Sequence, residues 1–208
     1  MAKSYHQYCP IAHALDLVGE RWSLLVVREL LDNGPLRYSD LHTSLDGCGT
    51  NILAARLKHL ERGGVIRKRR LSPPAASAVY ELTGYGEELR PVMHLLAHWG
   101  ARSLGPPSPE EELRRGWLAG ALRMAFPPTS TGTRIEFRVG DEIASLVDGN
   151  VDVGALDSPD AVVTGDAPGF YCFVVDRDLD AVTISGSDRA VRDVLATLPT
   201  ASVVAPVG

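Results

Sequence analysis

The feature that most constrains this chain is a set of three leucines between two turn signals. Leu53, Leu57 and Leu60 recur at i, i+4 and i+7, which places them on one face of a helix. Gly63 and Gly64 predict where that helix ends, and the hydroxyl of Thr50 is expected to cap its start. We therefore expect a helix over residues 50–62 whose leucine face is buried and whose opposite face is free.

A second helix and two strands surround this helix in the sequence. Leu41 and Leu45 give residues 38–45 an i, i+4 apolar pair, and residues 46–49 read as a turn. Residues 65–70 and 79–83 are predicted to be strands joined by a Pro-rich tip at 72–74. This order predicts a winged helix-turn-helix, which offers one helix to a DNA major groove and a basic loop to the backbone beside it.

The predicted contacts to double-stranded DNA follow from that arrangement. Small and polar side chains near the start of the second helix suit base edges, and Ala55 suits a thymine methyl. The residues expected to contact base edges are Thr50, Asn51 and Ala55. Contacts to phosphates or base edges are expected from Ser39, Arg56, Lys58 and His59. Contacts to the DNA backbone are expected from Arg67, Arg69 and Arg70. A helical hairpin with a solvated outer face is the alternative, but a basic run at the expected wing favours phosphate contact.

Motifs in about the first 100 residues resemble those of the HxlR family of winged helix-turn-helix transcriptional regulators. They include Cys9-Pro10, residues 14–22, 38–41, 56–57, 64–66, 79–83 and 98–100. The resemblance implies a homodimeric DNA-binding regulator, which we expect to be a repressor. It also implies that the terminal helices form the dimer, here the segment before Leu17 and a helix over residues 85–104.

The apolar residues of that last helix also favour a dimer. Leu89, Val92, Met93, Leu96 and Trp99 recur at helical spacing, and Leu95 adds to them. A single winged domain has little core of its own to cover so much apolar surface, although packing within that domain is the alternative. Because two-fold symmetric proteins read paired half-sites, we expect a homodimer.

The charge of the chain divides unevenly. The net charge is −5, but residues 1–105 contain 13 Lys and Arg and 10 Asp and Glu, a net charge of +3, while residues 106–208 contain 8 and 16, a net charge of −8. We expect the positive half to bind DNA and the acidic half to face away from it. The sequence shows no apolar stretch of transmembrane length and no signal peptide, so we expect a cytoplasmic protein that is not bound to membranes.

The second half predicts a separate α+β domain. Residues 105–109 read as a linker between a domain over 1–104 and one over 110–208. We expect a helix from Pro109 to about Phe126, strands over 134–139, 142–147, 160–165 and 181–186, and helices over 167–175 and 188–198. Turns are predicted at residues 140–141 and 149–150, and Ser187 is expected to cap the last helix.

Residues 160–166 and 182–187 resemble the last strands of a sterol-carrier-protein-like domain. Such domains hold a lipid or another hydrophobic molecule between a sheet and its helices, which implies a hydrophobic effector here. The expected lining is Trp117, Leu118, Ala121, Leu122, Phe137, Phe170, Tyr171 and Phe173. The same residues could instead form an ordinary α+β core. A regulator needs an input, and a ligand that prefers one state would shift its DNA-binding equilibrium.

Two other classes of function have weaker signals. Cys9 lies near His6 and His13 in the sequence, and some members of the family sense quinones or oxidants through a cysteine near this position, so a thiol-based sensor is the alternative to a ligand sensor.

The three cysteines do not have metal-site spacing, and we expect no metal and no cofactor. His94 and His98 could form a metal pair, but helix surface is the better interpretation. No catalytic motif is present, so a lipid-binding or enzymatic role of the second domain is the least favoured alternative.

Overall fold

The computed structural model describes residues 4–72, 77–108, 111, 113, 116–126 and 132–198. The chain forms two compact units, Met1–Met93 and His94–Gly208. The division falls inside helix α6 (Arg90–Leu104), earlier than the predicted linker. The second half of α6 belongs to the second unit, where the Tyr171 hydroxyl donates a hydrogen bond to the Ala101 carbonyl at 3.0 Å.

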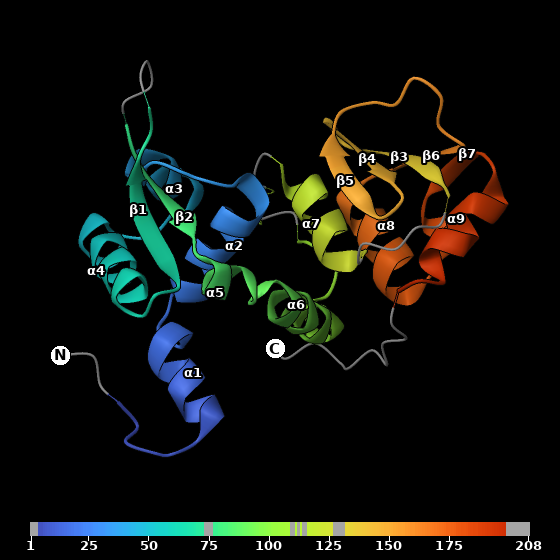
Figure 1. Ribbon diagram of the computed structural model, residues 1–208. Coiled ribbons are helices and arrows are strands. Elements are labelled where there is room, and N and C mark those ends of the chain that lie inside the picture. Colours follow the sequence, from blue (N-terminus) through green and yellow to red (C-terminus); the bar gives the residue numbers. More distant parts are fainter. Residues whose placement is uncertain are drawn as a thin grey trace. The chain divides into compact units, whose positions relative to one another are not determined.

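The first unit has the predicted winged helix-turn-helix (Figure 1). Its elements are α1 (Pro10–Val18), α2 (Ser23–Asn33), α3 (Tyr38–Ser44), α4 (Thr50–Arg62), β1 (Ile66–Arg70), β2 (Ala78–Leu82) and α5 (Gly84–Glu87). Helices α3 and α4 form the helix-turn-helix, and the antiparallel pair β1–β2 forms the wing. Residues 73–76, at the predicted tip of the wing, lie outside the described residues.

The leucine face of α4 forms the centre of this unit, as predicted. Leu53, Leu57 and Leu60 are all buried, in a cluster that also holds Val26, Val27 and Leu30 of α2. Burying an aliphatic side chain of this size contributes about 1.5–3 kcal/mol, so these contacts dominate the placement of the helix. Gly63 ends α4, and Gly64 follows with a φ of +71°, which confirms the predicted stop.

Two local predictions in the first unit were wrong. Thr50 does not cap α4, because Gly49 occupies the N-cap position and Thr50 is already the first helical residue. The helix expected over residues 85–104 is two helices, α5 and α6. Pro91 explains the break, because proline lacks an N–H and its ring clashes with the carbonyl four residues earlier, so it fits only the first turn of α6.

The second unit is a five-stranded sheet covered on one face by helices (Figure 1). The strands are β3 (Arg134–Val139), β4 (Glu142–Val147), β5 (Asn150–Val153), β6 (Ala161–Gly165) and β7 (Thr183–Gly186), in the order β5-β4-β3-β6-β7. Strands β3 and β6 are parallel, and the other pairs are antiparallel. The helices are α7 (Trp117–Ala125), α8 (Ala167–Tyr171), a π-helical turn (Cys172–Asp176), a short 3₁₀ turn (Leu179–Ala181) and α9 (Asp188–Leu195).

The core of this unit lies between the sheet and α7, α8 and α9. Ile135, Phe137 and Val139 point from β3 into it, and Phe137 contacts Phe170 edge-to-face with ring centroids 6.0 Å apart. Glu136, on the opposite face of β3, is buried but has partners: it accepts a hydrogen bond from Leu156 N at 2.7 Å and pairs with Arg138. The hydrogen bond from Leu156 and the bond from Arg138 hold the pKa of Glu136 below its usual value.

The boundaries of three elements differ from the prediction. Helix α7 begins at Trp117, because Gly116 has a left-handed φ of +82° and the Glu142 carboxylate accepts hydrogen bonds from Gly116 N and Leu118 N. Pro109, where this helix was expected to start, and residues 110, 112, 114 and 115 lie outside the described residues. The second turn is Asp148-Gly149, with φ of 50° and 77°, one residue earlier than expected. The last helix ends at Leu195. The predicted cap is confirmed, since Ser187 Oγ accepts from Ala190 N at 3.2 Å.

No helix within the described ranges is both long and apolar enough to cross a membrane.

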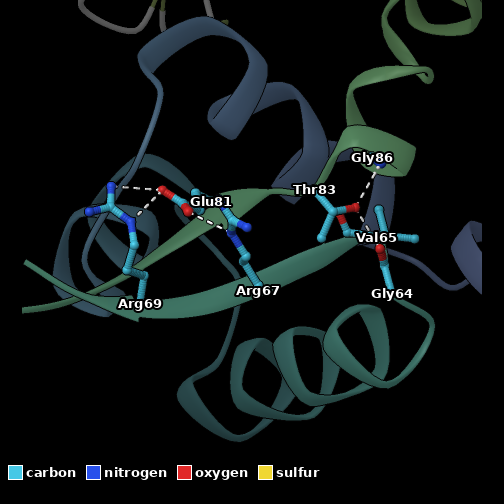
Figure 2. A network of polar contacts seen from close by, with 7 residues as sticks. All are labelled: Gly64, Val65, Arg67, Arg69, Glu81, Thr83 and Gly86. Carbon is cyan, nitrogen blue, oxygen red and sulfur yellow. Dashed lines mark hydrogen bonds and ion pairs between the residues drawn. The ribbon is translucent and has the colours of Figure 1, made fainter.

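A close approach of two backbones joins the wing to α5 (Figure 2). The Thr83 hydroxyl donates to the Gly64 carbonyl at 2.6 Å and accepts from Gly86 N at 3.0 Å, and Thr83 N donates to the Val65 carbonyl at 3.0 Å. A Cβ on Gly86 would lie 2.1 Å from the Val65 oxygen, far inside contact distance. Glycine at this position is therefore required by the space available.

The substitution Gly86→Ala is expected to destabilise the first unit by about 2 kcal/mol, because the backbone of Val65 or of α5 must move to admit the methyl group. Gly84→Ala is the matched control, since a Cβ added at this position of the same short helix would meet nothing within 4 Å. Urea unfolding followed by far-ultraviolet circular dichroism measures both variants. Equal stability of the two variants would contradict the steric argument.

Candidate nucleic-acid interface

The face of α4 opposite its leucines is open to solvent. Asn51, Ala55 and Lys58 are exposed on it, as the helical spacing requires, and Thr50 is exposed as the first residue of the helix, in line with the leucines. Short side chains near the N-terminal end let the helix approach a groove closely, and an amide can make paired hydrogen bonds to adenine. Three of the predicted contacts, Asn51, Ala55 and Lys58, are therefore brought together on one free surface.

A hydrogen bond joins α3 and α4, the two helices of the helix-turn-helix, at their junction. Tyr38 Oη, at the start of α3, donates to the Thr50 carbonyl at 2.8 Å. Ser39 is exposed beside it, and its hydroxyl donates to Asp40 Oδ1 at 3.2 Å. Ser39 therefore lies at the start of α3, where the first helix of such a motif crosses the DNA backbone.

Arg56 and His59 have partners within the protein. An Arg56 Nη atom lies 3.2 Å from a carboxylate oxygen of Glu20, and His59 Nε2 lies 2.9 Å from the Asp16 carbonyl. Both side chains thus connect α4 to α1 and to the segment that follows it. Helical spacing indicates that these residues lie off the leucine face, but only the packing of α1 decides that this flank is covered.

The wing presents its basic residues on two faces, of which Figure 2 shows the one with Arg67 and Arg69. Arg67 and Arg69 point to the same side, where Arg67 Nε lies 2.6 Å from Glu81 Oε1 and Arg69 Nε lies 2.9 Å from Glu81 Oε2. Lys68 lies on the other side, with its ammonium 5.6 Å from the centroid of the Tyr80 ring. Arg70 follows at the end of β1 and is exposed.

Glu81 organises the two arginines on its face of the wing. Its side chain is 12% exposed, whereas those of Arg67 and Arg69 are 65% and 45% exposed. The hydrogen bonds from Arg69 and then Arg67 lower the pKa of Glu81 below its usual value of 4.5, despite the opposing effect of desolvation. The carboxylate stays ionised at neutral pH and holds both guanidinium groups in a defined geometry.

The base of the wing is anchored to the helices. Leu36, before α3, pairs with Tyr80 of β2 through two backbone hydrogen bonds of 3.0 and 2.7 Å. Ile66 and Leu82 are buried opposite each other at the foot of the hairpin. The basic outer part of the wing is therefore held in a fixed position relative to α4.

The second unit contains a cavity of about 430 Å³ with a largely apolar lining. Four predicted lining residues, Trp117, Ala121, Phe170 and Tyr171, contribute to it. The other four, Leu118, Leu122, Phe137 and Phe173, do not line it, and each is buried in the core. The sequence did not indicate the part of the wall formed by α6, where Ala97, His98, Ala101, Arg102 and Leu104 contribute, because that helix was assigned to the first domain.

The three cysteines have different environments. Cys9 is half-buried and occupies the N-cap position of α1, where its carbonyl accepts from His13 N at 2.9 Å. Cys48 is buried in the turn between α3 and α4, and burial raises the pKa of its thiol; burial likewise raises the pKa of the Cys172 thiol. Within the described part of the chain, no group of three or more His, Cys, Asp or Glu residues could hold a metal ion.

A helix-turn-helix whose second helix, α4, has an exposed outer face, followed by an anchored basic wing, is typical of helix-turn-helix transcriptional regulators. The family model described as HxlR-like helix-turn-helix matches residues 17–107. The uncharacterised HTH-type transcriptional regulator sll1512 of Synechocystis is 37% identical over 108 residues, which are 52% of this chain and 79% of that protein. YvaP of Bacillus subtilis is 31% identical over 48% of this chain and 93% of its own length. The chain belongs to the HxlR family of helix-turn-helix transcriptional regulators.

Solved structures also align with part of the chain. PA1607 is 33% identical over 53% of this chain and 74% of its own, with a TM-score of 0.45. The reduced form of the transcriptional regulator YodB from Bacillus subtilis is 28% identical over 49% of this chain and all of its own, with a TM-score of 0.42. Both structures align with about half of the present chain.

Acidification is expected to loosen the wing through Glu81. Because the pKa of the folded-state carboxyl is depressed, its contribution is present above the unfolded-state pKa near 4.5 and is lost as pH falls through the folded-state value. Glu81→Gln should therefore speed amide hydrogen exchange in β1 and β2 at pH 7 relative to the parent chain, and the difference between the two should narrow as the pH falls below 4.5 and the parent carboxylate becomes protonated. A difference that persists at acidic pH would show that the carboxylate charge is not the cause.

Proposed function

We propose that this protein binds double-stranded operator DNA through its first unit and regulates transcription as a repressor. Helix α4 enters the major groove with Thr50, Asn51 and Ala55 toward base edges. Ser39, Lys58 and the wing arginines contact the phosphate backbone. The exposure of the short side chains of α4, opposite its buried leucines, carries this proposal.

Arg56 and His59 have a supporting role in this proposal. Their bonds to Glu20 and Asp16 set the angle of α4 on α1, so their effect on DNA affinity is indirect. Arg67 and Arg69 keep exposed guanidinium groups while they pair with Glu81, and guanidinium groups bind phosphate well. Arg70 is the last residue of β1, where strand alternation places it on the side of Lys68.

The regulator acts as a homodimer in this proposal. Tyr8, Ile11 and Leu15 are exposed on or just before α1, at 111%, 72% and 44% of their full areas. Leu95 and Trp99 are exposed on α6, at 70% and 69%. Large exposed apolar side chains on two terminal helices are typical of a surface that a second copy covers.

The second unit supplies the input, as a domain that binds a hydrophobic small molecule in the cytoplasm. The support is a cavity whose volume lies in the usual range for ligand pockets, roughly 300–1,000 Å³, with a mostly apolar lining. The resemblance of its last strands to those of a sterol-carrier-protein-like domain supports the same class of ligand. A purely lipid-binding or enzymatic role of this unit is the least favoured alternative.

A thiol sensor acting through Cys9 is the second candidate function. The observation in its favour is the position of Cys9 outside the core, at the first turn of a helix with an exposed apolar face. Oxidation or alkylation there would disturb α1 and with it the proposed dimer. Operator binding that is lost on oxidation in the parent chain and retained in Cys9→Ser would favour this candidate over the ligand sensor.

Asn51→Ala is expected to weaken binding to the operator by about 1–3 kcal/mol while changing the affinity for random DNA little, because a base contact is lost. Fluorescence anisotropy with the intergenic DNA upstream of the chain's own gene measures both affinities. Asn150→Ala, an exposed asparagine of the second unit, is the control. An equal loss on the two DNAs would remove Asn51 from the base-reading residues.

Replacing both Arg69 and Arg70 with Ala is expected to lower affinity for all DNA sequences. The slope of log affinity against log salt should become shallower by about one unit for each lost phosphate contact. Arg189→Ala, whose parent side chain is 91% exposed on α9, should leave the slope unchanged. A double variant with the parent slope would place the wing away from the DNA backbone.

Leu95→Glu is expected to convert the dimer to a monomer and weaken operator binding at least tenfold, since burying an unpaired carboxylate in an apolar interface is unfavourable. Sedimentation velocity measures the oligomeric state. Val153→Glu is the matched control, because Val153 is 73% exposed on β5 of the second unit. A stable dimer of the Leu95 variant would locate the interface elsewhere.

A further inference from the structure

The cavity of the second unit has polar groups at its wall as well as an apolar interior. The apolar part includes Trp117, Met124, Phe170, Val174 and Leu198. The polar part includes His98 and Arg102 from α6 and Arg177 from the end of the π-helical turn. This combination fits a ligand with an apolar body and a polar end.

The charges on the described lining are unlike those of the surrounding chain. Arg102 and Arg177 supply two guanidinium groups, whereas Glu111 is the one carboxylate among the described lining residues. Residues 106–208 as a whole carry a net charge of −8. A net positive wall in an acidic half of the protein favours an anionic ligand, because charge complementarity selects partners of opposite sign.

Arg177 is held in place at this wall by its backbone and its surroundings. It has a left-handed φ of 62°, which is uncommon for a residue with a side chain. Its guanidinium donates a hydrogen bond to the Val174 carbonyl, and burial lowers the pKa of this side chain. The side chain is partly buried, and a carboxylate at this wall would meet a guanidinium with several N–H donors.

His98 provides a second kind of polar partner. Burial, and then the nearby charge of Arg177, lower the pKa of His98 below its usual 6.5. The imidazole is therefore neutral at physiological pH and can donate or accept a hydrogen bond. The Tyr171 hydroxyl, by contrast, makes its hydrogen bonds within the protein: it donates to the Ala101 carbonyl at 3.0 Å and accepts from Gly105 N at 3.2 Å.

We propose that the effector is an amphipathic monocarboxylic acid, with its apolar chain in the cavity and its carboxylate at Arg102 and Arg177. This inference rests on the proposed ligand-binding role of the second unit. Helix α6 links the ligand to the proposed dimer surface: His98 and Arg102 line the cavity, and Leu95 and Trp99, each three residues before one of them on the same helix, are exposed. A ligand that shifts α6 thereby changes the proposed dimer surface.

The test compares decanoate with 1-decanol, which has the same chain without the charge. Isothermal titration calorimetry on the full-length protein, without DNA and below the aggregation limits of both compounds, measures each affinity. We expect decanoate to bind at least tenfold more tightly than the alcohol. Arg102→Gln and Arg177→Gln should each reduce that preference to threefold or less, and Arg189→Gln, an exposed arginine of α9 outside the cavity, should leave it intact.

Each other outcome contradicts a separate part of the proposal. Equal binding of acid and alcohol would overturn the carboxylate while keeping a hydrophobic effector. If Arg102→Gln and Arg177→Gln both still bind decanoate at least tenfold more tightly than 1-decanol, the carboxylate binds elsewhere. Failure of both compounds to bind, with operator binding intact in the anisotropy assay, would overturn the ligand-sensing role and leave the DNA-binding role standing. Arg102→Gln, a change on a helix surface, keeps the test valid if Arg177→Gln does not fold.

Discussion

The packing of the α4 leucines is the interaction on which the rest of the first unit depends. Leu53, Leu57 and Leu60 are buried against the valines and leucine of α2, so the rotation of α4 about its axis is decided by the hydrophobic effect. Once that face is buried, Asn51 and Ala55 must point outward. The helix that reads DNA in this proposal is thus oriented by residues that never touch DNA.

Polar bonds then refine a geometry that apolar burial has set. Tyr38 joins the two helices of the reader, Arg56 and His59 join α4 to its neighbours, and Thr83 joins the wing to α5. Glu81 does the same for the wing arginines, since one carboxylate accepts from two guanidinium groups. These bonds use side chains that look like surface groups in the sequence. They lower the local positive charge but hold what remains in a defined arrangement, which favours specific over diffuse binding to DNA.

Helix α6 connects the two halves of the proposed mechanism. Its first turn contributes Met93 to the core of the first unit, and its later turns line the cavity of the second. The exposed Leu95 and Trp99 lie beside cavity-lining residues on the same helix, and we propose that a second copy binds there. A single helix with these three environments can couple a ligand to the dimer, because a change of its position alters all three at once.

Sequence by itself determined the elements whose signals are local. The leucine period of α4, the glycines that end it, the alternation of β3 and the cap at Ser187 all depend on residues a few positions apart, and the structure has each of them where predicted. Contacts between distant segments needed the tertiary structure. It decided that Glu142 meets the start of α7, that Arg56 and His59 contact α1 and the segment after it, and that α6 lines the cavity whereas Phe137 and Phe173 do not. The physical reason is that side-chain spacing tells which residues share a face, whereas packing alone decides what that face meets.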